Sequence, residues 1–321
     1  MNLNETVVVA SRSFSKNDYL ISELKQHYSH IILNETGKTL QEKELLEFLR
    51  PADKAIIGIE EISNSLLDNL PNLKVISKYG VGLDNISLDS LRDKGIRLGF
   101  TPGVNKQSVA ELALTLTLIS LRKIHTNHIE ILQGEWPQEK GSELYGKKIG
   151  LLGFGNIGQK FAALLQPFNC KILFFDKKKF KDKELTMICK ESAINPSQIQ
   201  QEEFLTVLKN SDILSLHLPL FKGAENLISL KEMKYLKDNV SIVNTARGGI
   251  INESDLFNFL FDNKNAFAAF DVFVEEPVID NPLFQLPNFF GTSHRSSLTY
   301  EGINSMGLAA ITGLDDNIIP T

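Results

Sequence analysis

The chain has 321 residues, of which 42% are hydrophobic and 23% are charged, and its formal net charge is −5. This composition is typical of a globular protein, and the length predicts about two domains, each with its own core. The mildly acidic charge argues against a nucleic-acid partner and gives no attraction to an anionic membrane.

The N-terminus and the cysteines indicate a protein of the reducing cytoplasm. Residues 1–13 have neither a basic start nor a long apolar core, so we expect no signal peptide. The longest apolar stretch, ELALTLTLISL at 111–121, is too short and too threonine-rich to span a membrane. Cys170 and Cys189 lie in no CxxC pair and near no histidines with ligand spacing, so we expect neither a disulfide framework nor a metal site.

Apolar, strand-like runs alternate with helical patterns over the first hundred residues. The runs are TVVVA at 6–10, HIIL at 30–33, KAIIG at 54–58 and LKVIS at 73–77. Strands that are apolar on both faces and alternate with helices predict a parallel sheet. We therefore expect about four βα units in a first domain that covers residues 1–100.

A break at GFTPGVN, residues 99–105, precedes a long helical pattern. Ser108 and Glu111 have the spacing of a capping box, which predicts that the helix starts there. The pattern is apolar on nearly every face as far as Leu121. Such a helix is expected to be buried on all sides, between domains or in a subunit interface, and it predicts a homodimer.

A second βα series begins near residue 147, and polar residues follow its strands. Its strand-like runs are KKIGLLG, KILFFD, DILSLHLP, VSIVNTA, AFAAFD and NFFGT. The polar residues at their carboxyl ends are His217, Asn244, Thr245, Arg247, Asp271 and His294. For any one of them taken alone, the favoured interpretation is a cap, a turn residue or a surface histidine. Because ligands of open parallel sheets bind beyond the carboxyl ends of the strands, their shared placement predicts a functional site.

The stretch KKIGLLGFGNIGQKFAALL, residues 147–165, has the pattern of a dinucleotide-binding turn. Gly153, Gly155 and Gly158 form GxGxxG between a strand and a helix, and the helix N-terminus would face a pyrophosphate. Asp176 ends the next strand, 23 residues after Gly153, where a carboxylate accepts ribose hydroxyls and favours NAD. Residues 177–179 are lysines that could hold the 2′-phosphate of NADP, which stays an alternative.

Six stretches, in order and with matching spacing, resemble the D-isomer-specific 2-hydroxyacid dehydrogenase family, especially its phosphoglycerate dehydrogenase-like branch. They are KYGVGLDNI (78–86), TPGVNKQSVAELAL (101–114), LYGKKIGLLGFGNIG (144–158), SLHLP (215–219), NTARGGIINESDL (244–256) and FDVFVEEP (270–277). The resemblance implies two Rossmann-like domains with parallel sheets and an active site in the interdomain cleft. Residues 1–100 and 297–321 would form a flavodoxin-like substrate-binding domain, which a helix at 300–314 completes, and residues 101–296 an NAD-binding Rossmann domain.

The resemblance also implies roles for single residues. Arg247 would bind the carboxylate and keto oxygen of the substrate, and His294 would be the acid–base. Glu276, with Glu275 as the neighbouring alternative, would raise the pKa of His294. The substrate-binding residues would be Lys78, Tyr79, Gly80, Val81 and Gly82, with Lys78 either a phosphate-binding cation or a solvated lysine. The cofactor would contact Gly153, Gly155, Asn156, Ile157, Gly158, Asp176, His217, Pro219, Thr245, Ala246 and, at the nicotinamide carboxamide, Asp271.

The implied reaction is the NAD-linked interconversion of a 2-keto acid and a D-2-hydroxy acid. Candidate substrates are 3-phosphoglycerate, glyoxylate and hydroxypyruvate. Two alternatives stay open: formate or phosphite oxidation on the same scaffold, and a non-catalytic NAD(H)-sensing binding protein.

The sequence departs from the family pattern beside His294. The family usually has proline before this histidine and a small, glycine-containing run after it, whereas this chain has Ser293 and Arg295. Arg295 would point into solvent or bind an additional anionic group of the substrate. The sequence stops at Thr321, so we expect no serine-feedback module of the kind that some phosphoglycerate dehydrogenases carry.

Overall fold

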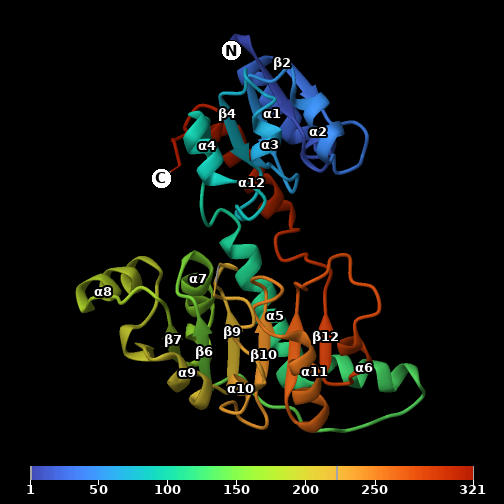
Figure 1. Cartoon of the computed structure of the whole chain (residues 1–321). Coiled ribbons are helices and arrows are strands. Elements are labelled where there is room, and N and C mark those ends of the chain that lie inside the picture. The colour runs from blue at the N-terminus through green and yellow to red at the C-terminus, as the bar shows by residue number, and fades with distance from the viewer. Residues whose placement is uncertain (1, 222, 321) are drawn as a thin grey trace. The chain divides into compact units, whose positions relative to one another are not determined.

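The computed structural model describes residues 2–221 and 223–320, and its contacts divide the chain into two units (Figure 1). Unit 1 comprises residues 1–105 and 299–321, and unit 2 comprises residues 106–298. The sequence places these changes near residues 100 and 296. Each unit has one parallel sheet, which confirms the predicted α/β class.

The described part of unit 1 contains a five-stranded sheet in the order β2-β1-β3-β4-β5, which is the flavodoxin-like order. Its strands are β1 (Asn2–Val9), β2 (Tyr28–Leu33), β3 (Lys54–Ile57), β4 (Val75–Lys78) and β5 (Arg97–Gly99). Its α-helices are α1 (Asp18–His27), α2 (Glu42–Leu49), α3 (Asn64–Leu67), α4 (Leu88–Lys94) and α12 (Tyr300–Gly313). β5 lies outside the predicted strands because it has only three residues and one of them, Arg97, is exposed.

Helix α12 confirms the helix predicted at 300–314 and completes the core of unit 1 (Figure 1). Ala310, Ile311 and Leu314 belong to one buried cluster with residues of β1 and β3. The Ser77 hydroxyl at β4 donates to the Ala310 carbonyl at 2.6 Å. The C-terminal helix is therefore an integral part of the first sheet's packing.

Lys54, itself buried, holds the end of α12 to the sheet through a partly buried cluster of charges. Its ammonium lies 2.8 Å from Asp315, 3.0 Å from Glu5 and 3.0 Å from the hydroxyl of Tyr28. Burial raises the pKa of Tyr28 to about 12, so the phenol stays protonated and donates to Asp315 at 2.7 Å. Desolvation opposes the charge on Lys54, but the hydrogen bonds to Asp315, Tyr28 and Glu5 outweigh it and raise its pKa.

Replacing Lys54 by methionine should therefore destabilise the protein by about 2 kcal/mol, because two carboxylates and a phenol lose their shared cation. The measurement is the urea midpoint of unfolding followed by circular dichroism. Lys74→Met is the matched control, since Lys74 is 62% exposed and its bond to Asp53 is a surface ion pair. Equal urea midpoints for Lys54→Met and Lys74→Met would contradict a stabilising role for the cluster around Lys54.

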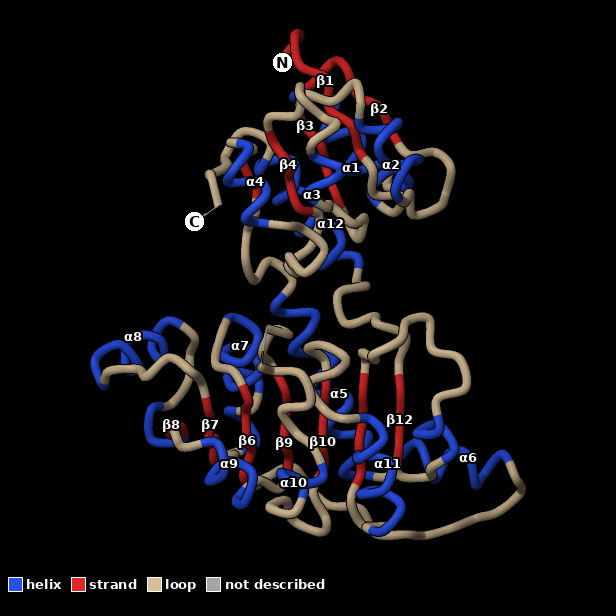
Figure 2. The backbone as a smooth tube through the Cα atoms, in the orientation of Figure 1, coloured by secondary structure: helices blue, strands red, loops and turns tan. Residues whose placement is uncertain are grey.

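Unit 2 contains, within its described residues, a seven-stranded sheet in the order β12-β11-β10-β9-β6-β7-β8 (Figure 2). Its strands are β6 (Lys148–Leu152), β7 (Lys171–Phe175), β8 (Ile199–Gln201), β9 (Ile213–Leu216), β10 (Ser241–Asn244), β11 (Phe267–Phe270) and β12 (Phe289–Gly291). Its α-helices are α5 (Lys106–Arg122), α6 (Ile124–Leu132), α7 (Asn156–Leu164), α8 (Asp182–Glu191), α9 (Phe204–Asn210), α10 (Leu230–Met233) and α11 (Glu253–Asp262). The strand order reverses between β6 and β9, which is where doubly wound sheets bind dinucleotides.

Helix α5 corrects the predicted capping box, whereas its predicted place in a subunit interface stays a prediction. It begins at Lys106, so Ser108 lies inside the first turn as a buried residue and is not the residue that caps the helix. The helix packs against α7, β10 and β11, while Leu112, Leu114 and Leu118 are only partly buried. Its apolar character is thus largely explained by packing within unit 2. Among the described helices, none is long and apolar enough to cross a membrane.

Candidate functional site

The turn between β6 and α7 leaves room for a ligand at its second glycine. Gly153 has a φ of +94°, and a Cβ there would lie 2.4 Å from the His217 carbonyl oxygen. A Cβ on Gly158 would lie 2.5 Å from the Gly153 oxygen, so this glycine permits close packing of helix and strand. A Cβ on Gly155 would meet nothing within 4 Å. The space beside Gly155, at the N-terminus of α7, fits a pyrophosphate.

Asp176 is tied to this turn by its carboxylate. One oxygen accepts from the backbone N–H of Phe154 at 2.8 Å, and the other accepts from Lys178 N–H at 2.9 Å. The next three lysines all have partners: Lys177 lies over the Phe221 ring, Lys178 pairs with Glu184 and Lys179 pairs with Glu203. The carboxylate at the end of β7 is therefore bonded to the glycine-rich turn, and each of these three described lysines is engaged with another side chain.

His217, which follows β9, and Thr245, which follows β10, are uncharged residues at the same sheet edge. Desolvation lowers the pKa of His217 to about 3, and its Nε2 lies 2.9 Å from the hydroxyl of Ser215. His217 is thus uncharged at neutral pH and cannot be a proton donor there. The hydroxyl of Thr245 is buried and has no hydrogen-bond partner among the residues that the structure describes. A buried hydroxyl without a partner is consistent with a ligand group that bonds to it. Pro219 is exposed.

His294 and Glu276 form the closest pair of titratable side chains at this edge. His294 Nδ1 lies 2.6 Å from Glu276 Oε2, and Glu276 Oε1 accepts from the backbone N–H of Phe273 at 2.9 Å. The hydrogen bond to Glu276 raises the pKa of His294, while desolvation acts against it. Desolvation alone would raise the pKa of Glu276, but the bonds from His294 and Phe273 outweigh it and lower that pKa. The pair favours an imidazolium beside a carboxylate.

Arg247 acts on both members of this pair. Its positive charge lowers the pKa of Glu276 and opposes the rise in the pKa of His294. The turn that carries it is fixed by Asn244, which is 1% exposed, donates to the Arg247 carbonyl and accepts from Ala246 N–H. Unit 2 therefore brings Arg247, Glu276 and His294 together, and Asn244, which the sequence places at this sheet edge without a role, supports the Arg247 turn.

Asp271 is fully buried and organises the turn that presents His294. Its carboxylate accepts from the Thr292 hydroxyl, from Arg295 N–H at 2.9 Å and from Ser296 N–H at 2.8 Å. Its carbonyl accepts from His294 N–H at 2.8 Å. His294 has a φ of 47°, a left-handed conformation that a non-glycine residue adopts only when its surroundings hold it. Asp271 is thus occupied with the His294 turn, in addition to any contact with a carboxamide.

Arg295 is exposed beside the histidine. Its backbone is held by Asp271, but in the part of the chain that the structure describes its guanidinium makes no ion pair or hydrogen bond. Arg247, by contrast, is among the leading charges that act on His294. These contacts favour the solvent-exposed interpretation of Arg295.

The loop at 78–82 belongs to unit 1 and follows β4. Tyr79 N–H donates to the Ile57 carbonyl at 2.8 Å, and its ring packs edge-on against Phe14. Gly80, Val81 and Gly82 are partly exposed. Lys78 is only 6% exposed, which does not fit a freely solvated lysine.

Within residues 2–221 and 223–320, no three His, Cys, Asp or Glu side chains are grouped so that they could hold a metal ion. Cys170 and Cys189 are free and buried.

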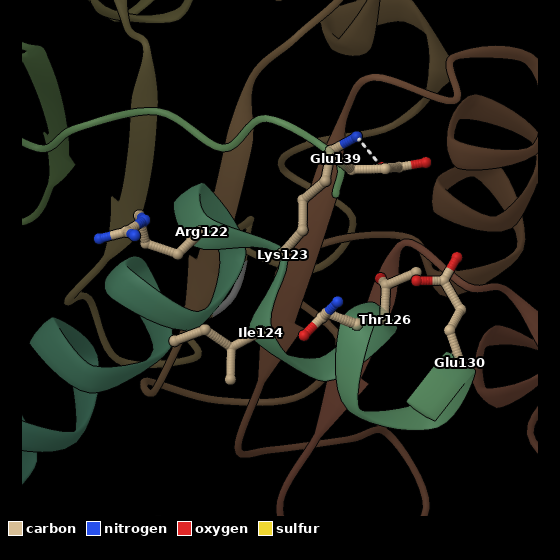
Figure 3. A pocket seen from close by; sticks show the side chains of 7 residues that line it. Arg122, Lys123, Ile124, Thr126, Glu130 and Glu139 are labelled. Carbon is tan, nitrogen blue, oxygen red and sulfur yellow. Dashed lines mark hydrogen bonds and ion pairs between the residues drawn. The ribbon is translucent and has the colours of Figure 1, made fainter. Parts of the chain in front are cut away.

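A polar pocket of about 340 Å³ lies where α5 meets α6 and includes the Lys123–Glu139 ion pair of 2.7 Å (Figure 3). None of the predicted site residues lines this pocket, so it is separate from the edge that carries His294.

Known proteins resemble this chain in both sequence and fold. Residues 114–296 match the D-isomer specific 2-hydroxyacid dehydrogenase, NAD binding domain. A D-3-phosphoglycerate dehydrogenase of Methanocaldococcus jannaschii is 34% identical over 284 residues, which are 86% of this chain and 52% of that protein. A hydroxypyruvate reductase of Thermotoga maritima is also 34% identical, over 87% of this chain and 89% of that one. A glyoxylate reductase structure from Paecilomyes thermophila has a TM-score of 0.83 at 24% identity, covering 96% of this chain and 93% of that one. The chain thus spans about half the length of the first relative and most of the other two.

Proposed function

The chain belongs to the NAD-dependent D-isomer-specific 2-hydroxyacid dehydrogenase family, and we propose that it reduces a short 2-keto acid with His294 as the proton donor. The observation that carries this proposal is the 2.6 Å contact between His294 and Glu276, beside the charge of Arg247. A protonated imidazole can give its Nε2 proton to a keto oxygen, since Nδ1 is engaged by the carboxylate. The guanidinium of Arg247 can bind a carboxylate and an adjacent oxygen in one plane.

The cofactor site proposed from the sequence has a physical basis in the described residues. The open space at Gly155, the N-terminus of α7 and the unpartnered Thr245 hydroxyl suit a pyrophosphate and a neighbouring polar group. Asp176 remains the candidate for the ribose hydroxyls, with Asn156 and Ile157 in the first turn of α7 and with Pro219, Ala246 and Asp271 along the sheet edge. When bound, NADH supplies the hydride that reaches the keto carbon.

The substrate is the less determined part of the proposal. The relatives' names point to glyoxylate, hydroxypyruvate and the 2-keto counterpart of 3-phosphoglycerate. We propose that, within the predicted loop 79–82, the backbone N–H groups of residues 80–82 bind the carboxylate of the substrate, since that of Tyr79 donates to Ile57. This role makes unit 1 the substrate-binding domain. Because Arg295 is exposed and the ammonium of Lys78 already has protein partners, neither is a committed phosphate ligand.

An NADH-oxidation screen over 2-keto acids tests the function directly. We expect turnover with glyoxylate or hydroxypyruvate, followed at the NADH absorbance. Turnover only with formate or phosphite in the oxidative direction would replace the proposed reaction. Binding of NADH with turnover of none of these compounds would instead support an NAD(H)-sensing protein.

Replacing Glu276 by glutamine should move the pH dependence of reduction to lower pH. Reduction needs protonated His294, so kcat/KM falls as pH rises through the His294 pKa, which Glu276 raises. Without the carboxylate that fall begins at lower pH, and at pH 8 we expect kcat/KM to drop by about 10- to 100-fold. Glu275→Gln is the matched control, because Glu275 is exposed and His294 bonds to Glu276. Identical pH profiles for Glu276→Gln and the wild type would contradict the pairing.

We also propose that the protein is a homodimer with α6 in the interface. None of the nine described residues of α6 is buried, although the helix contains Ile124, Ile129, Ile131 and Leu132. Leu132 is 73% exposed and the nearby Trp136 is 78% exposed. Apolar side chains gathered on one exposed helix are typical of a surface that a partner covers.

Sedimentation velocity at micromolar concentration should accordingly show a dimer for the wild type. The double variant Leu132→Glu, Trp136→Glu should shift the population to monomer, since two buried charges would face each other across the interface. Met187→Glu, at an exposed apolar residue on α8, is the control and should remain dimeric. A wild-type monomer, or a double variant that stays dimeric, would refute this assignment.

A further inference from the structure

The ammonium of Lys78 is used inside unit 1. Lys78 is the last residue of β4, and its Nζ donates to the Gly58 carbonyl at 2.6 Å and to the Asn85 side-chain oxygen at 2.6 Å. Gly58 follows β3, the neighbouring strand of the sheet, and Asn85 lies at the far end of the 79–82 loop. The Lys78 side chain therefore links the end of β4 both to the residue that follows β3 and to Asn85, where the loop ends.

Asn85 completes the same arrangement with its amide group. Its Nδ2 donates to the Glu60 carbonyl at 2.5 Å and to the Gly58 carbonyl at 3.2 Å. Its backbone carbonyl accepts from Ile62 N–H at 2.8 Å. The segment after β3 thus anchors the loop through three bonds with Asn85 and one with Lys78, and Lys78 also bonds directly to Asn85.

The start of the loop is fixed to the same strand. Tyr79 N–H donates to the Ile57 carbonyl at 2.8 Å, so both ends of the loop are bonded to β3 or to the segment that follows it. Between these anchors, residues 80–82 remain partly exposed. The fixed ends limit the conformations of the exposed backbone and so reduce the entropy lost when it binds a ligand.

We propose that Lys78 and Asn85 form a clasp that positions the backbone N–H groups of residues 80–82 for the carboxylate of the substrate. In this role Lys78 is a positioning residue and makes no contact with a phosphate. The inference rests on the proposed function, because it concerns the loop to which that function gives the carboxylate. It also concerns the substrate class. A clasp that only positions the loop serves phosphorylated and unphosphorylated 2-keto acids alike.

The energetics favour the clasp over a phosphate contact. If the Lys78 ammonium turned towards a phosphate, the Gly58 carbonyl and the Asn85 oxygen would lose a charge-assisted donor. The Gly58 carbonyl would keep only the longer bond of 3.2 Å from Asn85 Nδ2, and losing a charge-assisted bond at a buried acceptor is unfavourable. A phosphate contact from this position would have to overcome that loss before it contributed any affinity.

The experiment compares Lys78→Met with the wild type on hydroxypyruvate and on 3-phosphohydroxypyruvate. We expect KM to rise by about tenfold for both acids, with a smaller change in kcat, because one loop serves the carboxylate of each. The ratio of kcat/KM for the two acids should stay within about twofold of the wild-type ratio. A loss that falls selectively on the phosphorylated acid would overturn the proposal and make Lys78 a phosphate ligand.

Asn85→Ala and the double variant Lys78→Met, Asn85→Ala test the clasp itself. Because both side chains act through one arrangement, the double variant should raise KM no more than the stronger single variant. Additive effects would show that Lys78 and Asn85 act separately. Lys74→Met, just before β4, is the matched control for loss of a lysine and should leave both KM values unchanged.

Amide hydrogen exchange separates this inference from the proposed function. Peptides that cover residues 79–85 should exchange faster in Lys78→Met than in the wild type, while those of unit 2 should be unchanged. This result is expected even if the wild type reduces only the unphosphorylated acid or no 2-keto acid at all. Unchanged exchange of the loop would overturn the clasp whatever the substrate proves to be.

Discussion

His294→Ala should lower kcat for 2-keto acid reduction by about 10²- to 10⁴-fold while NADH binds with unchanged affinity. The loss follows from removal of the proton donor, since the developing alkoxide would have to take its proton from water. NADH affinity is expected to persist because the glycine turn at Gly155 and the Asp176 carboxylate do not involve His294. Steady-state kinetics and NADH fluorescence titration measure the two quantities on the same protein.

The histidine experiment has a simple control in another exposed histidine. His30 lies on β2 of unit 1 and is exposed, so His30→Ala should leave kcat unchanged. A kcat for His294→Ala within about twofold of the wild type would remove His294 from acid–base catalysis. A parallel loss of NADH affinity would mean that the variant has disturbed the sheet edge and not only the chemistry.

Gly248→Ala should lower kcat/KM by about 100-fold or more, because Gly248 sets the spacing between the loops that carry Arg247 and Glu276, to which we assign catalytic roles. A Cβ on Gly248 would lie 2.0 Å from the Phe273 carbonyl carbon and oxygen. The loop with Arg247 therefore cannot keep its distance from the loop with Glu276. Backbone atoms are the obstacle, so no side-chain rotation relieves the clash, and a loss of stability of about 1–3 kcal/mol should accompany the loss of activity.

Gly249→Ala separates displacement of the loops from simple destabilisation. Gly249 has a φ of +78°, so alanine there is strained, but its Cβ would lie 3.8 Å from the Val274 side chain, an ordinary contact. Both variants should lower the melting temperature, whereas only Gly248→Ala should lose most of its kcat/KM. Equal activity losses at matched stability would show that Gly248 has no specific role in loop spacing.

Much of the fold follows from local patterns in the sequence. The apolar run TVVVA at 6–10, within β1, and the helix at 300–314 are recognisable because each is long enough to show its pattern. β5 and β8 have three residues each, and the sequence of β8, IQQ, is mostly polar. Their strand conformation comes from pairing with β4 and β7, which a local pattern does not contain.

The residue types of the candidate site could be predicted from the sequence. The hydrogen bonds that hold these residues in place could not. The order of strands places Arg247, Asp271 and His294 at one sheet edge, and this could be inferred from the chain. That Asp271 holds the His294 turn depends on three donors at 292–296, and that Lys78 bonds to Asn85 depends on the path of a loop. The capping box at Ser108 is a case in which a local motif was misleading. The helix begins at Lys106, and Ser108 is buried within its first turn.

The discontinuity of unit 1 imposes an order on biosynthesis. Residues 106–298 form unit 2 as one uninterrupted segment, whereas the sheet of unit 1 needs α12, which is translated after all of unit 2. Since domains generally fold as units while the chain grows, the half that binds NAD can finish folding first. Until α12 emerges, the apolar cluster around Val7, Val9 and Ile56 lacks the part of its cover that Ala310, Ile311 and Leu314 supply. The unit whose strands are translated before unit 2 is thus the one whose core is completed after it.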